Sequence, residues 1–433
     1  MKYIYKYLSF LLSMILLMSV VGCSPKKAGD VVENGDSVGQ SYTLTVWGAE
    51  EDQAMLKEMC NAYAKANPKN KYTFNFGVQG EGEAADKVLN DVQSGPDVYS
   101  FSSDQINKLY AGGALARVGG DIEANIKEVN TQESVNAATV TIGGTNQLFA
   151  YPCTGDNCLF LYYDKSVYKN PEDLKSLDTV LSTAQSARKK VHFRLNDDGW
   201  YLSTFFFANP ELKYDVTYND KMVEQKVEIN FDNSAGLDVM KALRTYLYSD
   251  ALIAQTDDSK IIAAFTSNEG KREAAAAVSG TWNASTIKKL LGDNMGVCKL
   301  PTVKIGGKNM QLGGYMGYKL IGVNGYSKNK GEAHKLAQWL TNEENQLKRF
   351  KIRGFGPTNK NVTNMETVQN DTVISAVLDQ AQYNRAQKSV PATYWTPMAS
   401  LITPIITAKA NGTNVSDSML KGYLDALCRQ IRK

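Results

Sequence analysis

The chain has 433 residues, of which 43% are hydrophobic and 21% charged, and its formal net charge is +3. These values are ordinary for a globular protein, and the length allows more than one large core. The near-neutral balance gives no reason to expect nucleic acid as a partner. Only two histidines are present, His192 and His334, which argues against a histidine-based metal site or catalytic triad. We therefore expect no metal and no cofactor.

The N-terminal segment has the pattern of an export signal. Lys2 and Lys6 precede an apolar run over residues 8–21. This run is shorter than the roughly 20 residues that a membrane-spanning helix needs. Residues 1–22 are therefore predicted to be a signal peptide that is removed from the mature protein.

A cysteine follows this signal. Residues 20–24 resemble a bacterial lipobox, in which cleavage leaves Cys23 as a lipid-modified N-terminus. Residues 23–41 are then a lipidated, flexible tether. The protein is predicted to face the extracellular side, held to the cell membrane by lipid. An ordinary signal peptide with an incidental cysteine is the alternative.

The first part of the mature chain alternates strands with helices. Strands are predicted over residues 43–48, 72–76 and 96–101, each followed by a helical pattern of apolar residues. This order requires right-handed crossovers and a parallel sheet. Acidic residues lie in the turns after the first and third strands: Glu50, Glu51 and Asp104.

Residues 80–85 match the glycine pattern of a dinucleotide-binding turn between a strand and a helix. Glu81 lies between the two glycines, where its charge would repel a pyrophosphate. An exported protein also seldom meets such a cofactor. We therefore do not expect dinucleotide binding.

A strand over residues 148–152 leaves this first lobe, followed by a predicted turn at 153–157 and a strand at 158–164. Cys153 and Cys158 flank the turn and could form a disulfide, although free buried thiols fit equally well. The spacing of the cysteines matches no zinc site.

The remainder of the chain continues in the same style. Strands are predicted over residues 191–195, 274–278, 295–300 and 319–323, and one amphipathic helix over residues 331–350. The alternation of strands and helices indicates a second α/β lobe.

Large aromatic residues follow two of these strands. Trp282 comes after the apolar strand 274–278 and its Ser-Gly break, and Trp200 follows strand 191–195. Residues at the carboxyl ends of parallel strands lie where α/β proteins hold their ligands. A role in the core is the alternative, because tryptophan is often buried.

Several segments occur together in the order found in one protein family. They are residues 43–52, 95–115, 149–168, 279–288, 295–301 and 353–359, with Trp395 after them. Together with the lipobox and tether, this ordered set resembles the bacterial extracellular solute-binding proteins of sugar importers, the family that includes the maltose-binding protein.

The resemblance implies a two-lobed α/β fold of the type II periplasmic-binding class, with a mainly parallel sheet in each lobe and the ligand cleft between the lobes. The N-terminal lobe would comprise residues 41–151 and 312–361, and the C-terminal lobe residues 155–308 and 366–433. The lobes would close by a hinge motion. The resemblance also implies a monomer that is not an enzyme and that passes its solute to the permease subunits of an ABC importer.

Site residues follow from the same resemblance. The sugar-stacking tryptophans of the family match Trp282 and Trp200, and Trp395 falls in the region of a further one. The acidic residue after the third strand matches Asp104, with Phe101 near its aromatic neighbour. The other candidates lie in the turns after the first strand and the crossing strand: Glu50 or Glu51, and Asp156 or Asn157. Two serines before Asp104 and an extra residue in the 153–158 turn depart from the maltose-binding pattern, which leaves the particular sugar open.

These residue types suit a carbohydrate. A sugar ring has an apolar C–H face that tryptophan covers and a rim of hydroxyls that carboxylates and amides bind. We therefore expect an oligosaccharide in the cleft. Two alternatives stay open: a polyamine, glycerol phosphate ester or peptide in the same fold, or a secreted glycoside hydrolase, which also pairs carboxylates with aromatic rings.

Overall fold

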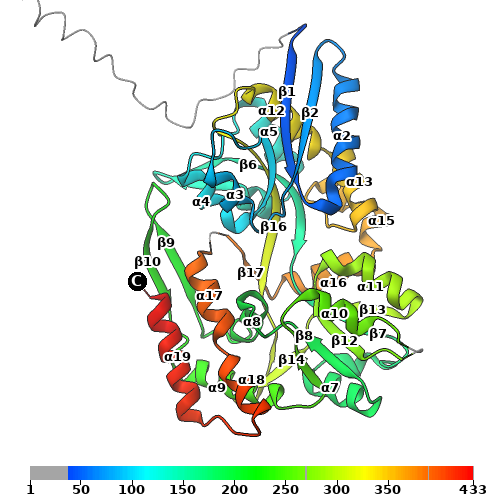
Figure 1. The fold of residues 1–433 in the computed structure, drawn as a ribbon, viewed down its shortest axis with the longest axis vertical. Coiled ribbons are helices and arrows are strands. Elements are labelled where there is room, and N and C mark those ends of the chain that lie inside the picture. The colour runs from blue at the N-terminus through cyan, green and yellow to red at the C-terminus, as the bar shows by residue number, and fades with distance from the viewer. Residues whose placement is uncertain (1–37, 269–270, 389, 433) are drawn as a thin grey trace, which may run out of the picture.

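The computed structural model describes residues 38–432, except residues 269–270 and 389. The chain forms two lobes, one above the other in Figure 1, and each lobe is built on its own sheet. The predicted two-lobed α/β fold is confirmed. The predicted signal peptide, Cys23 and most of the predicted tether lie outside the described residues.

The sheet of the N-terminal lobe contains β1 (Ser41–Gly48), β2 (Lys71–Val78), β3 (Val98–Ser102), β6 (Ala150–Asn157), β16 (Tyr315–Val323) and β17 (Arg385–Ala386). The order is β17-β16-β3-β1-β2, with β6 also paired to β16. β1 is parallel to β2 and β3, as the alternating pattern predicts. β16 is antiparallel to β3 and β6, so the sheet is mixed where the chain returns from the other lobe.

The sheet of the C-terminal lobe contains β7 (Phe160–Asp164), β8 (Lys190–Phe193), β11 (Leu252–Ala254), β12 (Ala274–Ser279) and β13 (Met295–Cys298), in the order β11-β8-β12-β7-β13. β8 is parallel to β11 and β12, whereas β7 is antiparallel to β12 and β13. Every residue of β12 is buried, which agrees with its continuous apolar sequence.

Short hairpins extend from the two sheets. They are β4 (Thr139–Ile142) with β5 (Thr145–Leu148), β9 (Tyr214–Tyr218) with β10 (Glu224–Ile229), and β14 (Thr302–Ile305) with β15 (Lys308–Gln311). The β9–β10 hairpin leaves the C-terminal lobe and rises beside the N-terminal lobe in Figure 1.

Helices pack around the sheets. In the described part of the chain, none is both long and apolar enough to cross a membrane. The helices of the N-terminal half are η1 (Glu50–Asp52), α2 (Gln53–Ala66), α3 (Ala84–Asn90), η2 (Ser103–Gln105), α4 (Ile106–Ala111), α5 (Gly120–Val129), α6 (Gln132–Ala137), η3 (Pro171–Leu174), α7 (Leu177–Ser186) and α8 (Gly199–Phe206). Those that follow are α9 (Ser234–Leu247), α10 (Asp258–Phe265), η4 (Thr281–Asn283), α11 (Ala284–Leu291), η5 (Gly292–Asn294), α12 (Lys330–Leu340), α13 (Glu343–Arg353), α14 (Lys360–Thr363), α15 (Glu366–Gln369), α16 (Thr372–Ala381), α17 (Ala392–Ser400), α18 (Thr403–Ala410) and α19 (Asp417–Ile431).

The chain passes between the lobes more than once. β6 leads directly into β7 of the other sheet. β16 begins at Tyr315 in the C-terminal core and continues to Leu320 in the N-terminal core. The helices α14 and α15 return the chain to α16, where Val373 packs in the C-terminal lobe. These crossings lie together at the middle of the molecule in Figure 1 and connect the two lobes.

The predicted turn at residues 153–157 is wrong, because this segment is the second half of β6. It pairs with β16, so that Asn157 lies opposite Gly317 and Thr154 opposite Lys319. Backbone pairing with a long neighbouring strand outweighs the local preference of Gly155 for a turn. The register shifts between Thr154 and Asn157, which marks a β-bulge in this segment.

The single helix predicted over residues 331–350 is also wrong. α12 ends at Leu340 and α13 begins at Glu343. Between them, the side chain of Asn342 accepts a hydrogen bond from the backbone N–H of Asn345 at 2.9 Å. Asn342 thus caps a new helix, which the apolar periodicity alone does not reveal.

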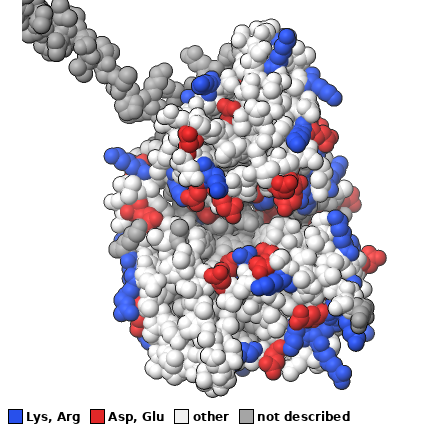
Figure 2. Space-filling view, viewed as in Figure 1, with Lys and Arg blue, Asp and Glu red and all other residues white. Residues whose placement is uncertain are grey.

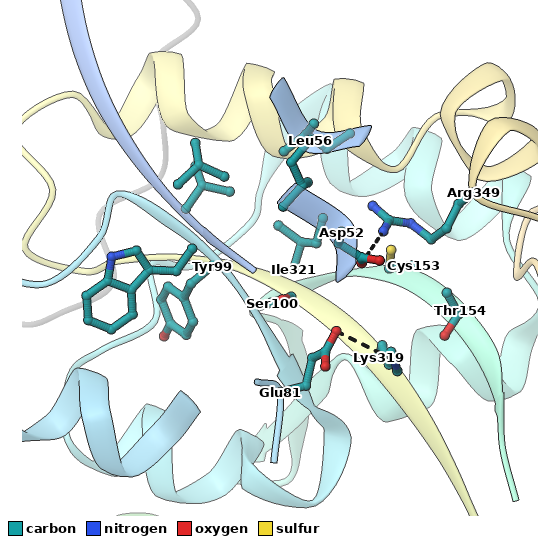
Figure 3. A pocket seen from close by; sticks show the side chains of 14 residues that line it. Asp52, Leu56, Glu81, Tyr99, Ser100, Cys153, Thr154, Lys319, Ile321 and Arg349 are labelled. Atoms are coloured by element: carbon teal, nitrogen blue, oxygen red, sulfur yellow. Dashed lines mark hydrogen bonds and ion pairs between the residues drawn. The ribbon is translucent and has the colours of Figure 1, made fainter. Parts of the chain in front are cut away.

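A buried ion pair joins the start of α2 to α13. One carboxylate oxygen of Asp52 lies 2.9 Å from Nη1 of Arg349, and the other lies 2.9 Å from Nε of Arg353. The side chains of Asp52 and Arg349 are each 5% exposed. Figure 3 shows this pair beside Cys153, in a small internal cavity that Lys319 also lines.

Replacing Asp52 by alanine should lower the free energy of unfolding by about 3–5 kcal/mol, because Arg349 would remain buried without its partner. Urea denaturation of the variant and of the wild-type chain measures this difference. Glu51→Ala, at the neighbouring exposed position, is the control and should change stability by less than about 0.5 kcal/mol. Equal stabilities for the Asp52 variant and the wild type would contradict the structural role of the ion pair.

Candidate ligand-binding cleft

The lobes face each other across a cleft of about 510 Å³. Figure 2 shows the molecule hollowed between its two halves, with acidic and basic side chains gathered along both rims. The lining residues come from both lobes and from the crossing segments. They are Glu81, Gly82, Glu83, Ser102, Asp104, Gln105 and Lys319 on the N-terminal side, Arg194, Asp198, Trp200, Tyr201, Asp258, Trp282 and Trp395 on the C-terminal side, and Asn157 and Gln387 between them.

Trp200 and Trp282 form a joint aromatic surface on the C-terminal wall. Their ring centroids are 5.8 Å apart with an interplanar angle of 54°. Trp200 lies in the first turn of α8, where the carboxylate of Asp198 accepts hydrogen bonds from the backbone N–H groups of Trp200 and Tyr201 at 2.8 and 3.0 Å. This N-cap fixes the direction in which the helix presents Trp200.

Trp282 follows β12 in the short helix η4. Gly280, two residues earlier, leaves room for the ring, because a Cβ atom there would lie 2.0 Å from the indole of Trp282 and would force it to shift. The Gly280 carbonyl accepts a hydrogen bond from the buried hydroxyl of Tyr162 at 2.9 Å. The turn that carries Trp282 is therefore held by the sheet beneath it.

Trp395 extends the aromatic surface from helix α17. Its ring packs edge-on against Tyr315, with centroids 5.3 Å apart, and against Tyr394, with centroids 5.1 Å apart. Tyr315 belongs to the crossing strand β16, so Trp395 lies where the C-terminal lobe meets the hinge.

A polar network lies behind the tryptophans. Arg194 contacts Asp198 at 3.2 Å and Asp258 at 3.1 Å. Asp258 also accepts hydrogen bonds from the hydroxyl of Tyr201 at 2.9 Å and from the amide of Asn283 at 3.2 Å. Burial raises the pKa of Asp198, and the backbone N–H of Tyr201 and the Arg194 guanidinium oppose that effect. The network holds its own charges in place before any solute binds.

The N-terminal wall is polar. Asp104 lies in η2, and its Oδ1 atom is buried without a hydrogen-bond partner. Burial raises the pKa of Asp104, opposed by the side chains of Ser102 and Gln387. Beside it, the Lys319 ammonium lies 3.6 Å from the Glu81 carboxylate and over the ring of Phe355 at 4.1 Å.

Gln387 joins the two walls at the floor of the cleft. Its side-chain oxygen accepts a hydrogen bond from Nε1 of Trp200 at 2.9 Å. Its backbone oxygen accepts one from the hydroxyl of Ser103 at 2.8 Å. The position of Trp200 is thereby tied to the segment that precedes Asp104.

The structure brings together Trp200, Trp282, Trp395, Asp104 and Asn157, and their role in ligand binding stays a prediction. Four other predicted residues do not line the cleft. Phe101 is fully buried in the N-terminal core, because its strand turns that side chain away from Ser102 and toward Tyr99. Glu50 and Glu51 are exposed on η1, outside the cleft lining. Asp156 is buried and absent from the lining, whereas its neighbour Asn157 lines the cleft.

Sequence reasoning missed Arg194, Asp258, Gln387 and Lys319 as residues of the cleft. Their contacts join segments far apart in the chain, so no local pattern marks them. Glu81 could have been predicted as a cleft residue from local sequence. It lies in the glycine-rich turn after a predicted strand, which is a common place for ligand contacts.

Among the described residues, no group of histidine, cysteine and acidic side chains is arranged to hold a metal ion. Cys153 and Cys158 are both buried free thiols. The extended conformation of β6 separates the two residues that a turn would have brought together.

Two lobes joined by crossing strands, with a lined cleft between them, define a class of solute-binding proteins. The family of bacterial extracellular solute-binding proteins matches residues 58–376. The chain belongs to this family. It is therefore a binding protein rather than an enzyme, which excludes the glycoside hydrolase alternative.

Individual relatives extend over nearly the whole chain. The galactooligosaccharide-binding protein of Bacillus subtilis (strain 168) is 24% identical over 96% of each chain. A solved structure with acarbose is 31% identical, covering 90% of this chain and 98% of that one, with a TM-score of 0.78. The maltodextrin-binding protein of L. casei BL23 without ligand is 22% identical, with coverages of 90% and 99% and a TM-score of 0.73.

Asp156 generates a prediction about pH. The side chain of Asp156 is buried, with 1% of the residue exposed. Burial raises its pKa above the ordinary 3.8, and the Lys319 ammonium opposes this effect. The folded protein therefore holds this proton more tightly than the unfolded chain, so the contribution of Asp156 to stability falls as the pH rises from 3.8 through the folded-state pKa.

Asp156→Asn should accordingly be more stable than the wild type at pH 7, and this advantage should disappear as the pH is lowered toward 4. Thermal unfolding between pH 4 and 8 measures the difference. Asp293→Asn, at a fully exposed side chain, is the control and should show no such trend. A variant that is less stable than the wild type at pH 7 would mean that the ionised carboxylate is stabilised in the fold.

Proposed function

We propose that this protein binds a carbohydrate, an oligosaccharide, in the cleft between its lobes and delivers it to the permease of an ABC importer. The observation that carries the proposal is the convergence of Trp200, Trp282 and Trp395 on one cleft whose opposite wall bears Asp104 and Gln105. The names of the relatives support the same solute class, because they include a galactooligosaccharide-binding protein and structures with acarbose and with maltotetraose.

The chemistry of the two walls matches the two surfaces of a sugar ring. Indole rings cover the apolar C–H face and gain stabilisation in proportion to the area removed from water. Carboxylate and amide groups on the facing wall bind the hydroxyl rim, and bonds to a carboxylate are the stronger ones. Asp104 and Gln105 supply a carboxylate and an amide to this wall.

A polyamine is the second candidate, because the cleft lining contains five carboxylates against two cationic side chains. Much of this negative charge is already neutralised within the protein. Glu81 pairs with Lys319, and both Asp198 and Asp258 pair with Arg194. A polycation would compete with these resident cations, whereas a neutral sugar would not, so the ion pairs favour the carbohydrate.

We also propose that residues 41–151 with 312–361 and residues 155–308 with 366–433 move as two rigid lobes of a monomer. Rotation about the crossing strands would bring the walls together on the solute. The closed form would then be the one that the permease recognises.

Thermal unfolding of the purified full chain against a panel of mono- and oligosaccharides, a polyamine and glycerol phosphate tests the solute class. A ligand at 100 times its dissociation constant should add about 2.7 kcal/mol of stability. We expect an oligosaccharide to raise the melting temperature and the other two compounds to leave it unchanged. A shift from the polyamine alone would replace the carbohydrate by the second candidate.

Trp200→Ala and Trp282→Ala should each weaken binding of the active sugar roughly 10- to 100-fold, because each removes one buried aromatic face. Isothermal titration calorimetry measures the loss. Trp339→Ala, on α12 and outside the cleft lining, is the matched control and should keep wild-type affinity. Undiminished binding by both cleft variants would place the sugar elsewhere on the molecule.

Attachment through Cys23 is proposed on the lipobox pattern that precedes the tether. When the full chain is expressed in a bacterial host, the protein should partition into the detergent phase of a Triton X-114 extraction, and Cys23→Ser should move it to the aqueous phase. Cys298→Ser is the control and should stay in the detergent phase. Partition of the Cys23 variant into detergent would contradict lipid anchoring at that residue.

A further inference from the structure

A second groove of about 600 Å³ adjoins the ligand cleft. Its lining includes Tyr218, Met222 and Val223 of the β9–β10 hairpin, with Asn107 of α4 and Pro391 before α17. Gly82, Asp104, Gln105 and Trp395 line both the groove and the cleft. The two spaces are therefore continuous, and they meet at the ring of Trp395.

The hairpin that forms the outer wall of the groove is fixed at both ends. At its base, Tyr214 packs against Tyr394, the neighbour of Trp395, with ring centroids 4.2 Å apart. Tyr218 lies four residues along the same strand, so alternation places it on the same face, which lines the groove toward the tip. The hairpin face that lines the groove therefore continues from the aromatic residues around Trp395.

The tip of the hairpin reaches the other lobe. The side chain of Asp220 accepts a hydrogen bond from the backbone N–H of Gly143 at 3.0 Å, and Met222 packs against the core of the N-terminal lobe. Met222 has a φ of 56°, and the side chain of Asn219 supports this turn by accepting from the backbone N–H of Val223 at 3.0 Å. The groove is therefore closed on its outer side by a segment that spans from one lobe to the other.

The groove repeats the chemistry of the cleft. Tyr218 and Trp395 supply aromatic surface, and Val223 exposes 54% of its area although it is apolar. Asn107 and Glu224 supply polar groups beside them. Val223 adds exposed apolar area next to the ring of Tyr218 in the same lining.

We propose that this groove binds the outer units of a linear oligosaccharide whose inner units occupy the tryptophan-lined cleft, and that the β9–β10 hairpin thereby sets the preference for chain length. This inference rests on the proposed function, because it needs a carbohydrate in the cleft. A sugar chain leaving the cleft past Trp395 enters the groove directly, since the two share that residue. Short sugars fill the cleft alone, whereas longer ones gain contacts with the hairpin.

Titration calorimetry on the full chain with two series of defined length, maltose to maltohexaose and galactobiose to galactohexaose, tests the proposal. In the series that binds, the affinity of the wild type should rise with length by about 10-fold or more between the shortest and the longest members. Tyr218→Ala and Val223→Ser should abolish most of this rise and leave the affinity for the shortest ligand that binds within about 2-fold of wild type. Val223→Ser changes an exposed side chain, so it tests the groove without threatening the fold.

Lys226→Ala, on the same hairpin and outside the groove lining, is the matched control and should retain the full length dependence. Affinity that does not change with length in the wild type would overturn the proposal while leaving carbohydrate binding intact. An equal loss for short and long sugars in both groove variants would overturn it as well. Failure of every member of both series to bind, with a response to the polyamine, would instead show that the proposed function itself is wrong and would overturn this inference with it.

Discussion

Strand β16 belongs to both lobes, and the cleft depends on this constraint. Tyr315 at its start is buried in the C-terminal core, and Leu320 is buried in the N-terminal core. Backbone hydrogen bonds to β3 and β6 hold its upper part, so the strand cannot slide without losing them. The crossing strands therefore keep the lobes facing each other across a common floor.

Gly317 of strand β16 leaves room for the side chains that form the floor of the cleft. A Cβ atom at Gly317 would lie 2.7 Å from Nδ2 of Asn157 and 3.0 Å from Oε1 of Gln387. The glycine thus leaves space for two amide side chains between the lobes. One of them, Gln387, accepts the hydrogen bond from the indole of Trp200, so the aromatic wall is positioned relative to the hinge as well as to its own helix.

The α/β fold and the positions of the cleft tryptophans can be predicted from local sequence, because strand periodicity and the turns after strands are short-range features. Trp282 is predictable in this way, since the apolar run before it ends at a glycine that leaves room for its ring. Asp156 and Asn157 show the limit. A glycine-containing segment reads as a turn, and only its pairing with a distant strand decides which of the two neighbours faces the cleft. Arg194 and Asp258 meet through tertiary structure alone, 64 positions apart, so no local pattern predicts their contact.

The charged side chains of the cleft are likewise held by both local and distant contacts. Three of the five carboxylates in the cleft lining are paired within their own lobe: Asp198 and Asp258 with Arg194, and Glu81 with Lys319. Internal pairing fixes the side chains in position and lowers the net field in the cleft, because opposite charges close together cancel at a distance. What the walls then offer a solute is directional hydrogen bonding beside aromatic surface. A neutral, hydroxyl-rich solute would use both features without breaking any of these pairs.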